Sequence, residues 1–301
     1  MSMTNVLGRE AVSESFNPLG IDGIEFIEFA TSKPQALGAV LESMGFRPVA
    51  RHRSREVELW RQGSMNIIVN SQSIDVPRTV QPSEHPILSA FALRVRDAEA
   101  AFHRALELGA WDIPVRAHAM ELNIPAIHGV GESLIYFVDR YEDFSIYDID
   151  FRPIPSVDPH PPAVSGMHFF GLVQYIGSDR TADWVEFYSR IFGFLALPDR
   201  VRFGIMPEGL LLQSPCRKFF LQLIEPVDNA RYAFGDEHLQ RIGVGTPDVM
   251  ATVAALESSG VQFLVSEKVK PSERGALTKP QLGGVMFELV HDEPAYHDAK
   301  Q

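Results

Sequence analysis

The stretch VSGMHFFGLVQYIGSDRTADWVEFYSRIFGF, residues 164–194, sets the pattern for the rest of the chain. It begins with apolar residues suited to a strand, is interrupted by Gly-Ser-Asp at residues 177–179, and continues with aromatic residues. The apolar residues that recur every three or four positions are Trp184, Phe187, Tyr188, Ile191 and Phe192. This spacing predicts an amphipathic helix, which Gly193 is expected to end.

The same order of a strand, a helix closed by glycine and further strands occurs four times. In the first half, strands are predicted at 21–29, 47–52, 57–61, 65–70, 89–95, 134–139 and 146–151, with helices at 32–44 and 97–108. In the second half, strands are predicted at 201–206, 209–213, 218–225, 241–245, 263–266 and 285–290, with a helix at 247–258. Internal repetition on this scale indicates a repeat architecture. The predicted fold class is α+β, with two domains. Each domain is a pair of βαβββ modules forming a cup-shaped or barrel-like mixed sheet with helices outside.

A proline-rich segment separates the two pairs of units. Five prolines fall within residues 153–163, and proline cannot donate a backbone hydrogen bond to a strand ladder. This composition predicts an extended linker. The predicted organisation is a flexible segment (1–18), a first domain (19–152), the linker (153–163), a second domain with the ligand pocket (164–293) and a tail (294–301).

The composition excludes several classes of partner. Lys plus Arg minus Asp plus Glu is 27 − 39 = −12, and this acidity argues against nucleic acid or an anionic membrane surface. The one cysteine, Cys216, fits a reducing compartment, so we expect a cytoplasmic protein. No apolar run reaches the ~20 residues that span a bilayer, and the N-terminus has no signal-peptide pattern.

The first half carries a dense family resemblance. The segments that carry it are GIEFIEFA (23–30), RHRSREVELWRQGSMNIIVN (51–70), RALELGA (104–110) and MELNIPAIHGVG (120–131). In this order they resemble the bacterial 4-hydroxyphenylpyruvate dioxygenase family of the vicinal oxygen chelate superfamily. The resemblance implies that this half is mainly scaffold and assembly surface, and that the chemistry belongs to the second half. We therefore also expect a homo-oligomer.

The second half resembles the same family in WVEFYSRIFGF (184–194), TPDVMATVAALESSGVQF (246–263) and GGVMFELV (283–290). The resemblance implies ferrous iron held by two histidines and one glutamate, and the glutamate falls on Glu288. Ungapped counting puts the histidine positions on Gly171 and Arg241, with His168 and His238 three residues upstream of each. A three-residue shift reverses the face of a strand, so each histidine needs a register correction to reach the pocket.

Two interpretations of this site follow. In the favoured one no metal is bound: Gly171 leaves space, and Arg241 supplies the positive charge opposite Glu288, as an Arg–carboxylate pair can. The predicted ligand-binding residues are then Arg241, Glu288, Gly171, Tyr175 and Gln174. The alternative is an active non-haem Fe(II) dioxygenase that uses His168, His238 and Glu288.

The functional hypotheses follow from these interpretations. The first is a dioxygenase-like protein with a degenerate iron site that binds or converts a small aromatic or carboxylate-bearing metabolite. The family that the chain resembles has a longer connection before its glutamate strand than residues 265–282 provide, and it has histidines where this chain has Gly171 and Arg241. We therefore do not expect this chain to form homogentisate. The others are the Fe(II) dioxygenase and a non-enzymatic binding or assembly protein that uses the first half as its interface.

Overall fold

The computed structural model describes residues 17–73, 79–113, 122–198, 201–205, 209–225, 237–267, 269–292 and 295–296. Most of the expected N-terminal lead-in (1–18) and C-terminal tail (294–301) therefore lies outside the described residues. Within the described part of the chain, no helix combines the length and apolar character that a membrane crossing requires.

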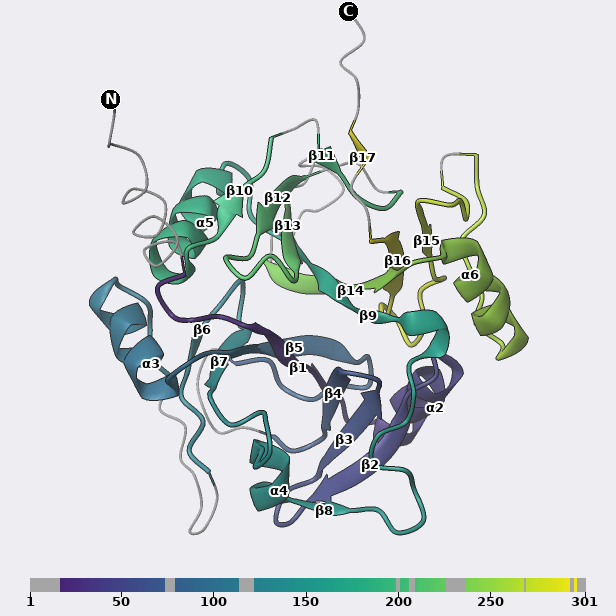
Figure 1. The fold of residues 1–301 in the computed structure, drawn as a ribbon, viewed down its shortest axis with the longest axis horizontal. Coiled ribbons are helices and arrows are strands. Elements are labelled where there is room, and N and C mark those ends of the chain that lie inside the picture. The colour runs from purple at the N-terminus through teal and green to yellow at the C-terminus, as the bar shows by residue number, and fades with distance from the viewer. Residues whose placement is uncertain are drawn as a thin grey trace, which may run out of the picture.

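The first half is a curved sheet with the helices Pro34–Ser43 and Ala98–Glu107 along its outer side (Figure 1). Its strands are β1 (Gly23–Ala30), β2 (Arg47–His52), β3 (Val57–Gln62), β4 (Met65–Asn70), β5 (Ile87–Arg94), β6 (Ala126–His128), β7 (Leu134–Val138) and β8 (Phe151–Pro153). Its helices are α2 (Pro34–Ser43), α3 (Ala98–Glu107) and α4 (Ile146–Asp150). The Asp97 carboxylate begins α3 by accepting a hydrogen bond from the Ala100 amide at 2.8 Å, as an N-cap residue does.

The second half repeats this plan. Its strands are β9 (His168–Tyr175), β10 (Leu195–Ala196), β11 (Val201–Arg202), β12 (Leu210–Gln213), β13 (Phe220–Ile224), β14 (His238–Thr246), β15 (Gly275–Leu277), β16 (Phe287–His291) and β17 (Ala295–Tyr296). Its helices are a 3-10 turn, η1 (Val164–Gly166), then α5 (Thr181–Phe187) with a π-helical continuation η2 (Tyr188–Phe192), and α6 (Val249–Ser258). The predicted amphipathic helix is confirmed, and Gly193 ends it in the left-handed region at φ 80°.

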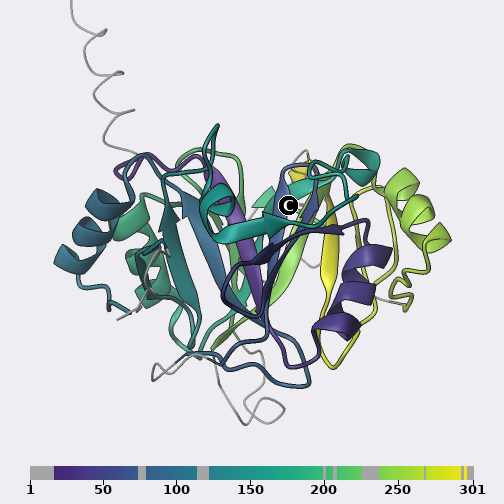
Figure 2. The same ribbon diagram turned by 90° about the horizontal axis from the view of Figure 1, so that it is seen from below.

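The two halves share one sheet path and one apolar core. Neighbouring strands follow the order β10-β12-β13-β9-β14-β5-β1-β4-β3-β2-β8, and the halves join where Leu239 of β14 pairs with Leu88 of β5. Phe137 and Phe192, one from each half, stack with ring centroids 6.1 Å apart. α3 and α5 lie at one outer side of this assembly, and α2 and α6 lie at the other (Figure 2). The predicted α+β fold of paired, cup-like sheets is confirmed.

Some local predictions were wrong. The strand predicted at 146–151 is the helix α4, because Ser145 and Asp148 form a capping box that outweighs the short apolar run. Ser32 does not cap α2; Lys33 occupies the N-cap position without a side-chain hydrogen bond. The strand predicted at 263–266 is reduced to one bridge between Phe263 and Thr278. Regular pairing with β16 comes from β15 instead.

Candidate functional site

Three residues stand side by side at the centre of the second half. Gly243 of β14 pairs with Glu288 of β16 on one side and with Gly171 of β9 on the other. Glu288 is 4% exposed. Its neighbours Phe287 and Leu289 pack into the helix-covered core, so alternation along the strand turns Glu288 toward the inner, concave face. The carboxylate therefore lies buried on that face beside two residues without side chains.

Arg241 neutralises this carboxylate. Its Nε donates to Glu288 Oε2 at 2.8 Å, and both side chains are buried, at 2% and 5% exposure. Its Nη1 donates to Gln240 Oε1 at 3.2 Å, while the buried Nη2 has no acceptor among the described residues. The ion pair suggested by the sequence is present. Because a guanidinium has no lone pair to offer a metal, this pair places a fixed cation where a metal ligand was expected.

Gly171 does not leave space, contrary to the sequence-based expectation. A Cβ built on Gly171 would overlap the backbone carbonyl of Phe220, the residue that pairs with Gly171 on β13. At Gly243 a Cβ would meet its nearest neighbours at 3.5 Å, an ordinary contact. Gly171 is therefore needed for the close approach of two strands, and β13 would have to move before any side chain could stand there.

The chain itself fills the inner space above Glu288. A Cβ on Gly204, which has φ +64°, would overlap the Glu288 carboxylate, so the segment after β11 lies directly against that side chain. Phe203 packs on Phe170 and Phe220, with ring centroids 4.8 and 4.6 Å apart. These contacts form a compact aromatic cluster directly before Gly204 in the chain and across β9 and β13.

The two histidines lie at opposite ends of an antiparallel strand pair. Each histidine required a shift in strand register to reach the pocket, and both shifts are present. Phe170 of β9 and Gln240 of β14 are left without a partner residue in the pairing of the two strands. Yet His168 pairs with Gly245, and His238 pairs with Tyr175 seven residues further along β9. At about 3.3 Å per residue this separates their backbones by roughly 20 Å. The alternative set of His168, His238 and Glu288 is therefore not brought together, because β9 and β14 run in opposite directions.

The histidines have other neighbours. His168 Nε2 lies 3.5 Å from Asp292 Oδ1, and the His238 ring packs edge-on against Tyr175 at 5.3 Å. Across the residues the structure describes, no three His, Cys, Asp or Glu side chains are grouped so that they could hold a metal ion. The described donors thus do not fit the iron site that the resemblance implies.

Two other predicted ligand-binding residues lie away from Glu288. Gln174 is fully buried, and its Oε1 accepts a hydrogen bond from the Tyr188 hydroxyl at 2.9 Å. Burial raises the pKa of that hydroxyl, so it stays a donor. Gln174 therefore faces the helix layer, and its assignment to the pocket was wrong because alternation carries it to the opposite face. Tyr175 lies at the end of β9, beside His238.

An open cavity of about 390 Å³ adjoins the aromatic cluster. Its lining residues are His168, Phe170, Leu197, Val201, Phe203, Gln213, Arg217, Lys218, Phe220 and Asp292. Lys218 Nζ forms an ion pair with Asp22 Oδ1 of the first half at 2.6 Å. Sequence reasoning missed this cavity; the adjacent cations Arg217 and Lys218 in the β12–β13 turn were the available signal.

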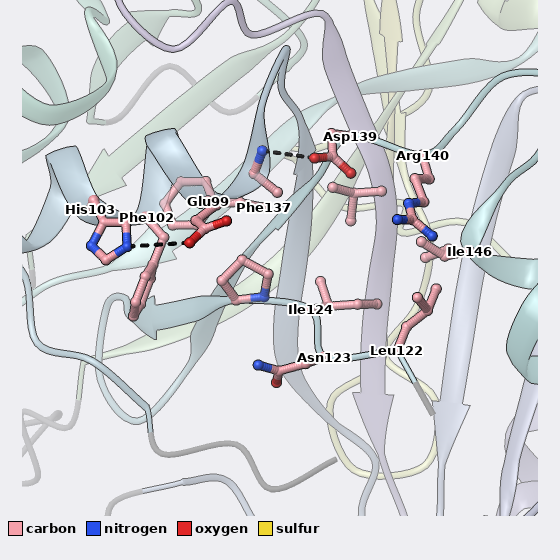
Figure 3. Close-up of a pocket in the computed structure, with 13 residues that line it drawn as sticks. Glu99, Phe102, His103, Leu122, Asn123, Ile124, Phe137, Asp139, Arg140 and Ile146 are labelled. Atoms are coloured by element: carbon pink, nitrogen blue, oxygen red, sulfur yellow. Dashed lines mark hydrogen bonds and ion pairs between the residues drawn. The ribbon is translucent and has the colours of Figure 1, made fainter. Parts of the chain in front are cut away.

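A further groove of about 460 Å³ lies beside α3 and β7 (Figure 3). Glu99 and His103 form an exposed pair at its edge, 3.7 Å apart. Asp139 Oδ2 accepts from the Ala98 amide at 3.0 Å. Asp139 thus helps to begin α3, and Glu99 and His103 pair on the exposed side of that helix.

Comparison with known proteins agrees with this fold. A family model described as hydroxyphenylpyruvate dioxygenase, HPPD, N-terminal, matches residues 16–152. A 4-hydroxyphenylpyruvate dioxygenase of Pseudomonas sp. (strain P.J. 874) is 34% identical over 263 residues, 83% of this chain and 73% of the relative. A 3-dehydroshikimate dehydratase of Pseudomonas aeruginosa is 31% identical, over 84% of this chain and 42% of the relative.

Solved structures match across nearly the whole chain. A fusion of a xylose isomerase-like TIM barrel with 4-hydroxyphenylpyruvate dioxygenase aligns with a TM-score of 0.71 and 23% identity, covering 93% of this chain and 50% of the fusion. A triple mutant of 4-hydroxymandelate synthase from Streptomyces coelicolor aligns with a TM-score of 0.69 and 16% identity, covering 94% of this chain and 95% of the synthase. Paired βαβββ modules of this kind define a protein of the vicinal oxygen chelate superfamily. Within it, the chain belongs to the 4-hydroxyphenylpyruvate dioxygenase family.

Proposed function

We propose that this chain binds a small aromatic carboxylate in its second half and does so without the two-histidine, one-glutamate iron triad. The observation that carries the proposal is the buried contact of 2.8 Å between Arg241 and Glu288. An iron ion at Glu288 would have to displace the guanidinium and would still lack a three-residue ligand set, because no three described His, Cys, Asp or Glu side chains are grouped to hold a metal. We therefore derive no oxygenation step for this site.

The cavity beside the aromatic cluster supports the choice of ligand. Phe170 and Phe220 stack at 4.9 Å and offer an aromatic wall on which a ring can pack. Arg217 lines the same cavity, and no described residue accepts a hydrogen bond from its guanidinium. A guanidinium binds a carboxylate through two parallel N–H donors. The ring of a small aromatic carboxylate would thus pack on Phe170 and Phe220, and its carboxylate would bind Arg217.

The metal part of the proposal is tested with protein purified without chelator. Iron content and O2 consumption with 4-hydroxyphenylpyruvate are measured after loading with Fe(II), beside a 4-hydroxyphenylpyruvate dioxygenase as positive control. We expect iron well below one ion per chain and O2 consumption at background. One iron per chain in the native protein, lost in a folded Glu288→Gln variant, would overturn this part.

The binding part is tested with 4-hydroxybenzoate as probe, using methyl NMR of the full chain. We expect shifts of Leu197 and Val201, which line the cavity. Arg217→Met should weaken binding about tenfold or more, since a charge-assisted hydrogen-bond pair is lost. Arg190→Met is the matched control, because Arg190 is exposed on η2, lies outside the cavity lining and pairs with Glu186. Equal affinity in the two variants would contradict the proposal.

A further inference from the structure

The first half contains a larger polar cavity, of about 650 Å³, on its own concave face. The lining residues of this cavity come from β1, β2, β3, β4, β5, α4 and β8 and from the loops beside them. This volume is in the range of small-molecule sites. The cavity has a buried charged centre and an apolar wall, the second formed by Val49, Leu59 and Phe151. It is separate from the cavity beside Phe220 in the second half.

The charged centre is Glu25 with Arg94. Arg94 Nε donates to Glu25 Oε2 at 2.6 Å, with Glu25 2% and Arg94 25% exposed. Asn66 Nδ2 lies 3.2 Å from the other carboxylate oxygen. Burial raises the pKa of Glu25, although the charges of Arg94 and Arg61 lower it. The centre is therefore shielded from bulk water. Electrostatic interactions are stronger in such a buried site than in water.

Arg61 adds a second cation. Its Nε donates to Asn66 Oδ1 at 2.7 Å, and its Nη1 donates to the Pro159 carbonyl at 2.9 Å. Neither partner carries charge, so two guanidinium groups face one carboxylate at the centre. The other acidic lining residues, Glu142, Asp143 and Asp148, are exposed at the surface. The interior of the cavity thus carries an excess positive charge.

The guanidinium groups of Arg94 and Arg61 are oriented by neighbouring tyrosine rings, and some of their N–H donors are not used. Arg94 lies over the Tyr141 ring at 5.5 Å, and Arg61 lies over the Tyr147 ring at 5.4 Å. Such stacking orients the guanidinium plane. Among the described residues, the terminal nitrogens of Arg94 and Nη2 of Arg61 have no hydrogen-bond acceptor. Oriented donors beside an apolar wall are the elements of a carboxylate-binding site.

We propose that this cavity of the first half binds a small organic carboxylate with an apolar or aromatic body. The carboxylate takes the free donors of Arg94 and Arg61, and the body packs against Val49, Leu59 and Phe151. The site is independent of the proposed function of the second half, and it gives a ligand role to the half expected to be scaffold.

The test uses benzoate as probe and the uncharged benzamide as its isostere, added to the full chain labelled in its methyl groups. We expect saturable shifts of Val49 and Leu59 with benzoate, with a dissociation constant of roughly 1 mM or lower. Benzamide should bind at least about tenfold more weakly. No saturable shift of these methyl groups up to about 10 mM benzoate, or equal binding of benzamide, would overturn the proposal.

Variants locate the site. Arg61→Met should weaken benzoate binding at Val49 and Leu59 about tenfold, whereas Arg51→Met should leave it unchanged. Arg51 lies on the neighbouring strand, is 69% exposed and pairs with Glu58 outside the cavity. Folding is checked by thermal unfolding, and the uncharged Arg61→Gln is used if Arg61→Met does not fold. Unchanged binding in a folded, uncharged Arg61 variant would refute the site. Arg217→Met should leave these shifts in place, so failure here is distinguishable from failure in the second half.

Discussion

Each half of the described chain has a buried glutamate paired with an arginine on the concave face of its sheet, but of these two pairs only Glu25–Arg94 opens into a cavity. Arg94 is 25% exposed and opens, with Glu25, into the cavity of the first half. Arg241 is 2% exposed, and Gly204 packs against its partner Glu288. The pairs have similar contacts, at 2.6 and 2.8 Å. Access to the pair, rather than the pair itself, therefore decides whether it can meet a ligand.

This difference bears on the roles expected of the halves. The resemblance places the chemistry in the second half, yet there Gly204 lies directly against the Glu288 carboxylate. The first half, expected to be scaffold, keeps a large polar cavity. In the second half, a polar cavity lies beside the aromatic cluster of Phe170, Phe203 and Phe220.

The largest expected effect separates the two ion pairs. Arg241→Met should lower the free energy of unfolding by about 3–5 kcal/mol, because it leaves Glu288 buried without a cation. Arg94→Met should cost less, about 1–3 kcal/mol, because Asn66 and Arg61 still face Glu25. Chemical denaturation at pH 7 measures both. A double variant, Arg241→Met with Glu288→Leu, should recover most of the loss. Equal costs for the two single variants would show that access does not distinguish the pairs.

The next effect concerns two facing glycines. Gly171→Ala should lower the free energy of unfolding by about 1–3 kcal/mol, because the new methyl group overlaps the Phe220 carbonyl and forces β13 to move. Gly243→Ala is the matched control on the paired strand, with its nearest contact at 3.5 Å, and should change stability by less than about 1 kcal/mol. Denaturant titration compares them. If both substitutions were tolerated equally, the close approach at Gly171 would not be structurally required.

A smaller effect depends on pH. Burial raises the pKa of Glu28, although Ser89 and Asn70 lower it by donating hydrogen bonds. The folded protein then holds a proton that the unfolded chain has lost, so this residue's contribution to stability falls as the pH rises above about 4.5 toward the folded pKa. Glu28→Gln should remove that decline. The free energy of unfolding measured at pH 5 and pH 8 checks this, and an identical slope in the two proteins would contradict it.

The smallest effect concerns an exposed contact between the halves. Lys218→Ala removes the ion pair with Asp22 and should lower the free energy of unfolding by less than about 1 kcal/mol, since both side chains are about half exposed. Asp22→Ala should behave alike. Thermal unfolding at low and high salt measures the change. A loss of several kcal/mol would show that this bridge, rather than the shared apolar core, holds the halves together.

Much of the architecture could be predicted from local patterns. The helix from Trp184 to its stop at Gly193, the Arg47–His52 and Met65–Asn70 strands and the fourfold repeat follow from spacing alone. The ion pair of Arg241 with Glu288 could also be predicted, because a buried carboxylate requires a compensating charge. Local patterns failed at residues 146–151, where side-chain capping competes with strand propensity.

The sequence by itself determined the family, the order of the elements and the presence of an arginine and a glutamate to neutralise each other. Only the tertiary structure decided what surrounds them. The shifts at Phe170 and Gln240, the tight contact at Gly171 and the separation of His168 from His238 arise from pairing between distant strands. Register and strand direction depend on partners far away in the chain, and no local pattern around residues 164–194 contains them.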